Sequence, residues 1–199
     1  MTMTSRERVQ AVLNYEVPDR VPIILGVSNA TGIKIKPYRG LLKLLNIQAE
    51  EKYIYDWPEL GTALPDERVM QRLHSDVRGI LDRFPLEVYQ RNQSRPPHTP
   101  FIDDWGGGQM EIAPEEWFPG IAPIPDATTV DVLEKYPWPN MDDPYRVAHV
   151  RAQAQALHEQ NQYAIMATPW LMFPFERGFE MQGMEKFLMN LAVEPDFAQ

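Results

Sequence analysis

The sequence predicts an α/β fold of the (β/α)₈ barrel type, present as an incomplete amino-terminal portion with a β-hairpin excursion. Short apolar runs at 20–26, 76–81 and 163–167 have the composition of buried strands, and stretches with helical periodicity separate them. Strands separated by helices pair in parallel through right-handed crossovers. A complete barrel needs about 250 residues. A chain of 199 residues with three or four recognisable strands therefore favours part of a barrel, and a doubly wound sheet is the alternative.

The first 32 residues are expected to form a helix, a strand and a loop. Thr4 followed by Glu7 fits a capping box, and the apolar spacing that follows predicts a helix ending near Asn14. The run 20–26 (RVPIILG) is the best candidate for a first buried strand, because it is rich in β-branched residues and bounded by turn residues. Its loop then spans 27–32.

Two more helices are expected before the second strand. Pro37 suits the first turn of a helix that continues to Leu45, and another helix should run from Pro65 to about Leu73. The run 76–81 (DVRGIL) fits the second strand.

The pattern changes between residues 85 and 125. Short extended pieces, prolines and the loop DDWGGG at 103–108 predict a β-hairpin excursion with glycine at its turn. Asp143 followed by Pro144 should then open a long helix, and 163–167 (YAIMA) follows as a third strand. We interpret the excursion as an insertion within one barrel domain that covers residues 1–199.

The last thirty residues are expected to begin with an aromatic loop at 169–179. A helix should follow at 184–191, and Glu194-Pro195-Asp196 should begin another.

Composition argues against several classes of function. The net charge is −9, with the acidic excess concentrated between Asp103 and Asp143, so nucleic acid is an unfavourable partner. The chain has no cysteine, which leaves no disulfide framework and no thiolate metal site within it. The first 14 residues lack the apolar core of a signal peptide, and no apolar run reaches the roughly 18 residues that span a bilayer. We therefore expect a cytoplasmic protein without a membrane partner.

Three stretches together resemble the uroporphyrinogen decarboxylase superfamily, which includes corrinoid-linked methyltransferases. They are SRERVQAVLNYEVPDRVPI at 5–23, RLHSDVRGI at 72–80, and TPW at 168–170 with the following aromatic loop and the helix GMEKFLMNLAVEPDFA. Their order and spacing are similar to the first helix and the first three strands of that group. Its members are (β/α)₈ barrels much longer than this chain, so the resemblance implies truncation.

The chain departs from the decarboxylase branch at three places. The resemblance puts Val27 and Thr31 where decarboxylases carry two arginines, whose planar guanidinium groups bind substrate carboxylates in pairs. It puts Phe175 in the place of a tyrosine, and phenylalanine cannot donate a hydrogen bond. The catalytic aspartate has its nearest counterpart in Asp82, one residue out of register, whereas Asp76 lies earlier, near the start of the strand.

These departures favour the methyltransferase branch. The resemblance implies a zinc ion held by histidine and cysteines in the second half of the barrel, beyond Gln199, where it would activate a thiol acceptor. The implied function is methyl transfer involving a corrinoid, with a corrinoid protein as a possible partner. The alternatives are uroporphyrinogen decarboxylase itself, using Lys34, Lys36 or Arg39 for the carboxylates, and an inactive fragment or small-molecule-binding module. A half-barrel also exposes strand edges, so we expect self-association.

In a parallel barrel the active site lies at the carboxyl ends of the strands, which directs attention to three loops. The candidate catalytic residue is Asp82, and the alternative is a solvated charge beside Arg83. The candidate substrate-binding residues come from the loops after the strands and from the excursion, and they are Ser28, Asn29, Asp103, Trp105, Trp170 and Phe175. Asp103 and Trp105 belong either to a substrate lid or to an ordinary hairpin turn, and the aromatic residues belong either to a pocket or to the core. No metal ligand is assigned within the chain.

Overall fold

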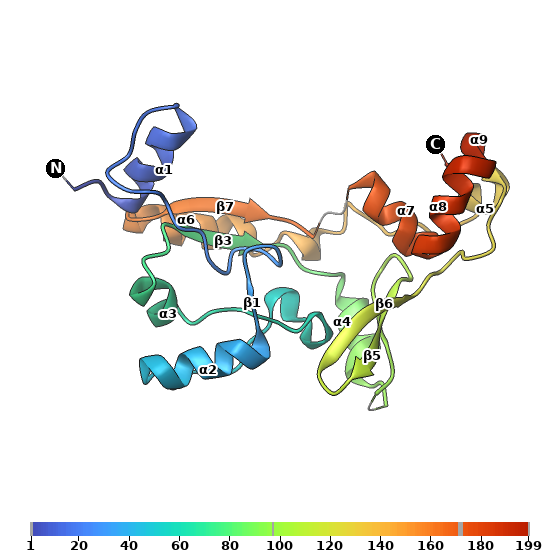
Figure 1. Ribbon diagram of the computed structural model, residues 1–199, viewed down its shortest axis with the longest axis horizontal. Coiled ribbons are helices and arrows are strands. Elements are labelled where there is room, and N and C mark those ends of the chain that lie inside the picture. The colour runs from blue at the N-terminus through green and yellow to red at the C-terminus, as the bar shows by residue number, and fades with distance from the viewer. Residues whose placement is uncertain (1, 97, 171–172, 199) are drawn as a thin grey trace. The chain divides into compact units, whose positions relative to one another are not determined.

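The computed structural model describes residues 2–96, 98–170 and 173–198, which form a mixed α/β structure (Figure 1). The chain divides into two compact units: the first comprises Met1–Arg83 and Arg146–Trp170, and the second comprises Phe84–Tyr145 and Leu171–Gln199. The α/β class is confirmed. The described residues form no closed barrel, so the barrel and the single domain stay predictions. None of the described helices combines the length and the apolar character that crossing a membrane requires.

Among its described residues, the first unit contains four α-helices, four short strands and two 3₁₀ turns. The helices are α1 (Ser5–Leu13), α2 (Ile35–Leu45), α3 (Glu67–Arg72) and α6 (Val150–Gln160). The strands are β1 (Ile33–Lys34), β2 (Thr62–Ala63), β3 (Val77–Leu81) and β7 (Ala164–Thr168), and the 3₁₀ turns are η1 (Ile54–Asp56) and η2 (Pro58–Leu60).

The central feature of this unit is the parallel pair of β3 and β7. Val77 pairs with Ala164 and Leu81 with Thr168, so the two strands end together. Helix α6 contacts both strands and α1 contacts β7. Parallel pairing of the second and third predicted strands is thereby confirmed.

Helix α1 of the first unit follows the sequence prediction closely. The Thr4 side chain accepts a hydrogen bond from the Glu7 amide and the Glu7 carboxylate accepts one from the Thr4 amide, so the predicted capping box is present. Asn14 caps the other end of α1. A core cluster forms where α2 meets β2 and α3, and it comprises Ile35, Tyr38, Leu42, Ala63 and Val69.

The predicted first strand, 20–26, is wrong. This segment lies beside the start of β3, but it does not form a strand. Its amides bind side chains there, where a strand would bind backbone carbonyls. The Asp76 amide donates to the Ile23 carbonyl (2.7 Å), whereas the Ile23 amide donates to the Asp76 carboxylate (2.8 Å) and the Leu25 amide to the Ser75 hydroxyl (3.2 Å). The chain then crosses β3 closely, because a Cβ on Gly79 would lie 2.8 Å from Val27 Cα.

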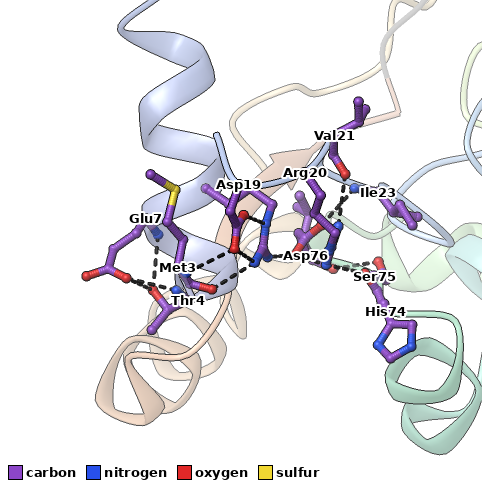
Figure 2. A network of polar contacts seen from close by, with 12 residues as sticks. Met3, Thr4, Glu7, Asp19, Arg20, Val21, Ile23, His74, Ser75 and Asp76 are labelled. Atoms are coloured by element: carbon purple, nitrogen blue, oxygen red, sulfur yellow. Dashed lines mark hydrogen bonds and ion pairs between the residues drawn. The ribbon is translucent and has the colours of Figure 1, made fainter. Parts of the chain in front are cut away.

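A buried ionic network holds α1 and this segment to the start of β3, and Figure 2 shows its hydrogen bonds. The Asp76 side chain has no exposed surface and accepts from Arg8 Nη1 (2.6 Å) and from Arg20 Nη1 (2.7 Å) and Nη2 (2.8 Å). Arg8 also donates to Asp19 (2.6 Å). Because Asp76 lies at the amino end of the strand, opposite the expected site, we assign the network a structural role.

The second unit contains five α-helices and one antiparallel sheet among its described residues. The helices are α4 (Leu86–Gln93), α5 (Val130–Glu134), α7 (Pro174–Gln182), α8 (Met184–Val193) and α9 (Pro195–Ala198). The sheet has the order β4–β5–β6, formed by β4 (Phe101–Ile102), β5 (Gly108–Ala113) and β6 (Glu116–Ile121).

The predicted hairpin is present in this sheet, whereas its place as an excursion within a barrel stays a prediction. Residues 103–107 connect β4 to β5, and Gly106 has a φ of 77°, a left-handed conformation that glycine adopts without strain. The sequence did not predict α4. Its Asn92 side chain donates to the Ile102 carbonyl (2.9 Å) and accepts from the Ile102 amide (3.0 Å), so α4 is fixed to β4 by a residue that has low helix propensity.

Two other predicted boundaries need correction. The helix expected from Asp143 begins only at Val150, because Pro144–Arg146 forms a separate 3₁₀ turn and the Arg146 carbonyl accepts from the Arg83 amide (3.1 Å). The loop expected at 169–179 contains the start of α7, where Pro174 occupies the first turn and Glu176 completes a capping arrangement with the Phe173 amide. Residues 171–172 of that loop lie outside the described residues.

Candidate functional site

The carboxyl ends of β3 and β7 bring Asp82 and Trp170 together. Asp82 directly follows β3, and Trp170 comes two residues after β7. The Asp82 carboxylate accepts a hydrogen bond from the Trp170 amide at 2.8 Å. This bond ties the two loops to each other and shows that Asp82 does more than carry a solvated charge.

An aromatic cluster lies against the Trp170 indole. The rings of Tyr55 and Trp57 meet it edge to face, with centroids 5.2 and 5.3 Å away. The Tyr55 hydroxyl donates to the Thr168 carbonyl at 3.0 Å. Burial, followed by the negative charge of Asp82, raises the pKa of Tyr55 to about 12, so its hydroxyl keeps its proton at neutral pH.

The loop after 20–26 reaches the same end of the strands. The Thr168 hydroxyl donates to the Val27 carbonyl. The Thr31 hydroxyl accepts from the amides of Val27 (3.2 Å) and Ser28 (3.1 Å), and it lies 3.1 Å from the Ser28 hydroxyl. Asn29 accepts from the Thr62 hydroxyl at 2.6 Å. The side chains of Ser28 and Asn29 therefore shape this loop from within.

Four of the seven predicted site residues thus belong to the first unit, where Asp82, Trp170, Ser28 and Asn29 border one end of the β3–β7 pair. Sequence reasoning missed Tyr55, Trp57, Thr62 and Thr168, which complete the arrangement. The segment YDWPEL at 55–60 is compact and aromatic. Aromatic residues are typical of buried segments, but nothing in the spacing of this one indicates which loop it contacts.

The other three predicted residues belong to the second unit. Asp103 Oδ1 accepts from the amides of Trp105 and Gly107, both at 2.9 Å, as expected for an aspartate in a tight turn. The Arg177 guanidinium lies 4.1 Å from the centroid of the Trp105 ring, 3.8 Å from Asp103 Oδ2 and 3.2 Å from Glu180 Oε2. One arginine is therefore shared by two carboxylates.

This sharing has an electrostatic consequence. Burial, with a contribution from Asp104, raises the pKa of Asp103 to about 6 although Arg177 opposes the shift. Burial also raises the pKa of Glu180 to about 7. The positive charge of Arg177 acts to lower this pKa, and the negative charges of Asp103 and Glu176 act to raise it. Glu180 can therefore take up and release a proton near neutral pH. Arg177 and Glu180 were missed, although an Arg-x-x-Glu spacing places two such side chains on one face of a helix.

Phe175 packs within the helical part of the second unit. Its ring meets Phe187 of α8 and Phe179 of α7 edge to face, with centroids 5.5 and 6.5 Å away. These contacts stabilise the pairing of α7 with α8, and the remaining half of the side chain is exposed.

Comparison with known protein families, with curated proteins and with solved structures found no match. Within the described ranges, no three His, Asp or Glu side chains come close enough together to hold a metal ion.

Proposed function

We propose that the chain is the amino-terminal part of a uroporphyrinogen decarboxylase-like barrel enzyme and that the complete enzyme transfers a methyl group with the help of a corrinoid. The activity proposed is that of the longer protein, and this part of it contributes one wall of the substrate site. The proposal rests on the resemblance together with one structural observation.

That observation is the convergence of Asp82, Trp170 and the Val27–Thr31 loop at the carboxyl ends of the β3–β7 pair. Parallel α/β proteins place their ligands at this end of the strands. The partly exposed Trp170 indole beside a carboxylate suits an apolar or aromatic substrate that needs one polar contact for orientation.

The same loop argues against a porphyrinogen as substrate. Val27 is fully buried, and the Thr31 hydroxyl is used to hold the loop amides, so neither position binds a carboxylate. Two of the bases named as alternatives are used elsewhere: Lys34 donates to the Leu60 carbonyl (2.6 Å) and Arg39 donates to Glu51 (2.6 Å); Lys36 also has a partner. Decarboxylation by uroporphyrinogen decarboxylase remains the alternative.

The residues that the structure describes fit neither zinc nor a corrinoid. The described side chains offer no set of metal ligands, and Tyr55 and Trp57 are too deeply buried to present a flat open surface to a macrocycle. We therefore derive no step through either group. In the proposal, other residues of the barrel or a corrinoid protein supply them.

The roles proposed for this chain are positioning roles. Asp82 fixes the Trp170 loop through the Trp170 amide, and its carboxylate supplies the negative charge that orients a substrate. Thr168 fixes the Val27 carbonyl, which sets the position of the neighbouring loop. Trp170, backed by Tyr55 and Trp57, excludes water from one side of the site.

The coding sequence downstream of Gln199 provides the first test. We expect it to encode further strand and helix repeats and a His/Cys constellation suited to zinc. A downstream sequence lacking such a constellation removes the reason for preferring methyl transfer.

An activity assay provides the second test. The full-length protein is expected to leave uroporphyrinogen unchanged and to methylate a thiol acceptor from methylcobalamin. Asp82→Asn should lower kcat/KM about 10²-fold, because misplacement by an ångström has that effect, whereas Asp131→Asn, on exposed α5, should leave it unchanged. Formation of coproporphyrinogen would establish the decarboxylase instead.

A further inference from the structure

A groove of about 700 Å³ lies in the second unit, outside the site described above. Helix α4, the hairpin loop and the segment 137–145 form its walls. The side chains that matter for its chemistry are Leu86, Glu87, Asp104, Trp138, Asp143 and Tyr145. Its volume falls within the range of small-molecule sites.

Hydrogen bonds fix the three walls relative to one another. Arg91 of α4 donates to the carbonyls of Ile102 and Asp103, both at 2.8 Å, which ties α4 to the hairpin loop. Tyr136 donates to the Trp105 carbonyl (2.5 Å), and the Trp138 ring meets the Trp105 ring edge to face at 5.9 Å. The groove is therefore preorganised and need not form around a ligand.

The groove is acidic, and it lies in an acidic unit. The second unit carries 16 Asp and Glu against five Lys and Arg, a net charge of −11, whereas the first unit has 12 against 14. Glu87, Asp104 and Asp143 line the groove, and its described lining includes neither Lys nor Arg. A cleft with charge of one sign in such a field concentrates ligands of the opposite sign.

The arrangement of these carboxylates distinguishes between kinds of cation. The three carboxylates come from three different walls, Glu87 from α4, Asp104 from the hairpin loop and Asp143 from the segment 137–145, so they suit a ligand whose positive charges are separated. Apolar and aromatic surface lies among them. The Trp138 indole N–H is used by the Leu133 carbonyl (2.8 Å), yet 48% of the residue is exposed, which leaves ring surface for an ammonium group or an alkyl chain.

We propose that this groove binds a small organic polycation, a linear polyamine with protonated amines spaced along an apolar chain. The carboxylates pair with the separated amines, and the alkyl segments lie on Trp138, Leu86 and the neighbouring prolines. Such a site is independent of the proposed methyl transfer and gives the acidic unit a ligand of its own.

Isothermal titration calorimetry of the full chain with spermidine in 150 mM NaCl tests the proposal. Saturable binding is expected, with n-butylamine binding more weakly because it has one charge. Equal charge equivalents of Mg²⁺ should not displace spermidine, because Mg²⁺ has no apolar chain. Trilysine binding more tightly than spermidine would assign the groove to a basic peptide and overturn the small-molecule proposal.

Variants localise the binding. Glu87→Gln should weaken spermidine binding about fivefold, as expected for one exposed charged contact, and Trp138→Leu about tenfold. Glu134→Gln removes the same charge from exposed α5 in the same unit and should change the affinity by less than about twofold. If Trp138→Leu fails to fold, the two glutamate variants decide. Equal weakening by both, or displacement by Mg²⁺, means that spermidine is a diffuse counter-ion and overturns the proposal.

Discussion

Replacing Asp76 with asparagine tests the ionic network that anchors the amino-terminal segment. The substitution keeps the shape of the side chain and removes its charge. Its effect should be large because the carboxylate has no exposed surface and accepts from Arg8, Arg20 and the Ile23 amide. An asparagine has one acceptor oxygen and places an NH₂ donor against these donors.

The magnitude follows from what is left behind. Removing one partner of a buried ion pair costs about 3–5 kcal/mol, chiefly because the other charge stays buried. Here Arg8 keeps Asp19 as a partner, and the Arg20 side chain is 38% exposed, so water compensates part of the loss. We therefore expect the free energy of unfolding to fall by about 3 kcal/mol, at the lower end of that range.

Urea denaturation monitored by circular dichroism measures this difference, with Glu51→Gln as the matched control. Glu51 also binds an arginine through two hydrogen bonds, but both side chains are more than one third exposed, so its loss should cost less than about 1 kcal/mol. Equal losses in the two variants would refute the reasoning, because burial would then not determine the cost.

The pKa of Asp76 is lowered: burial acts to raise it, and the hydrogen bonds from Arg20, Ile23, Ser5 and Arg8 outweigh that effect. Wild-type stability from this group is therefore present above the ordinary aspartate pKa and lost as the pH falls through the lowered one.

Three further predictions concern other parts of the chain. Gly79→Ala should lower the free energy of unfolding by about 1–3 kcal/mol, because the new Cβ would overlap the Val27 backbone. Gly40→Ala, in α2 with open space around it, should raise the free energy of unfolding by about 0.5–1 kcal/mol. Equal urea midpoints for the two variants would contradict the close crossing. Asp103 and Glu180 have raised pKa values of about 6 and about 7, so their contribution to stability is present at pH 4 and is lost as the pH rises through 7. The urea midpoint of the wild type should therefore fall between pH 5 and 7.5, and Glu180→Gln should make this fall smaller. An unchanged fall in the variant would exclude Glu180 as its source. Apolar side chains between residues 12 and 24 are 42–99% exposed, so light scattering should detect concentration-dependent self-association, and a monomer with a sharp melting transition would contradict it.

Local signals predicted α1, α2, α3 and the paired strands, but they did not predict α4 or α5. The capping box at Thr4 and the proline near the start of α2 act within one turn, so the sequence alone carries them. The strands β3 and β7 are short apolar runs between turns and pair in parallel as expected. The run 20–26 has the same composition, but the Asp76 and Ser75 side chains accept the hydrogen bonds of its Ile23 and Leu25 amides. Strand composition does not indicate that side chains from elsewhere in the chain will bind a segment's backbone amides.

The candidate site was predicted in part for the same reason. Asp82 and Trp170 were identified because they follow strands, and strand ends are a local feature. Tyr55 and Thr62 reach the site from other elements, and Arg177 meets Asp103 across 74 positions of sequence. Such contacts are set by tertiary packing, which periodicity and spacing do not describe.

The two compact units are interleaved along the chain, and this affects the order in which they can form. The first unit is interrupted by Phe84–Tyr145 and the second by Arg146–Trp170, so each is built from two separate stretches. At about 5–20 residues per second, β3 leaves the ribosome several seconds before its partner β7 has been made. During that interval its edge has no strand to pair with, and closing so long a loop slows folding further. No single cut in the chain yields either unit whole, so producing one unit by itself requires its two stretches to be joined by a linker.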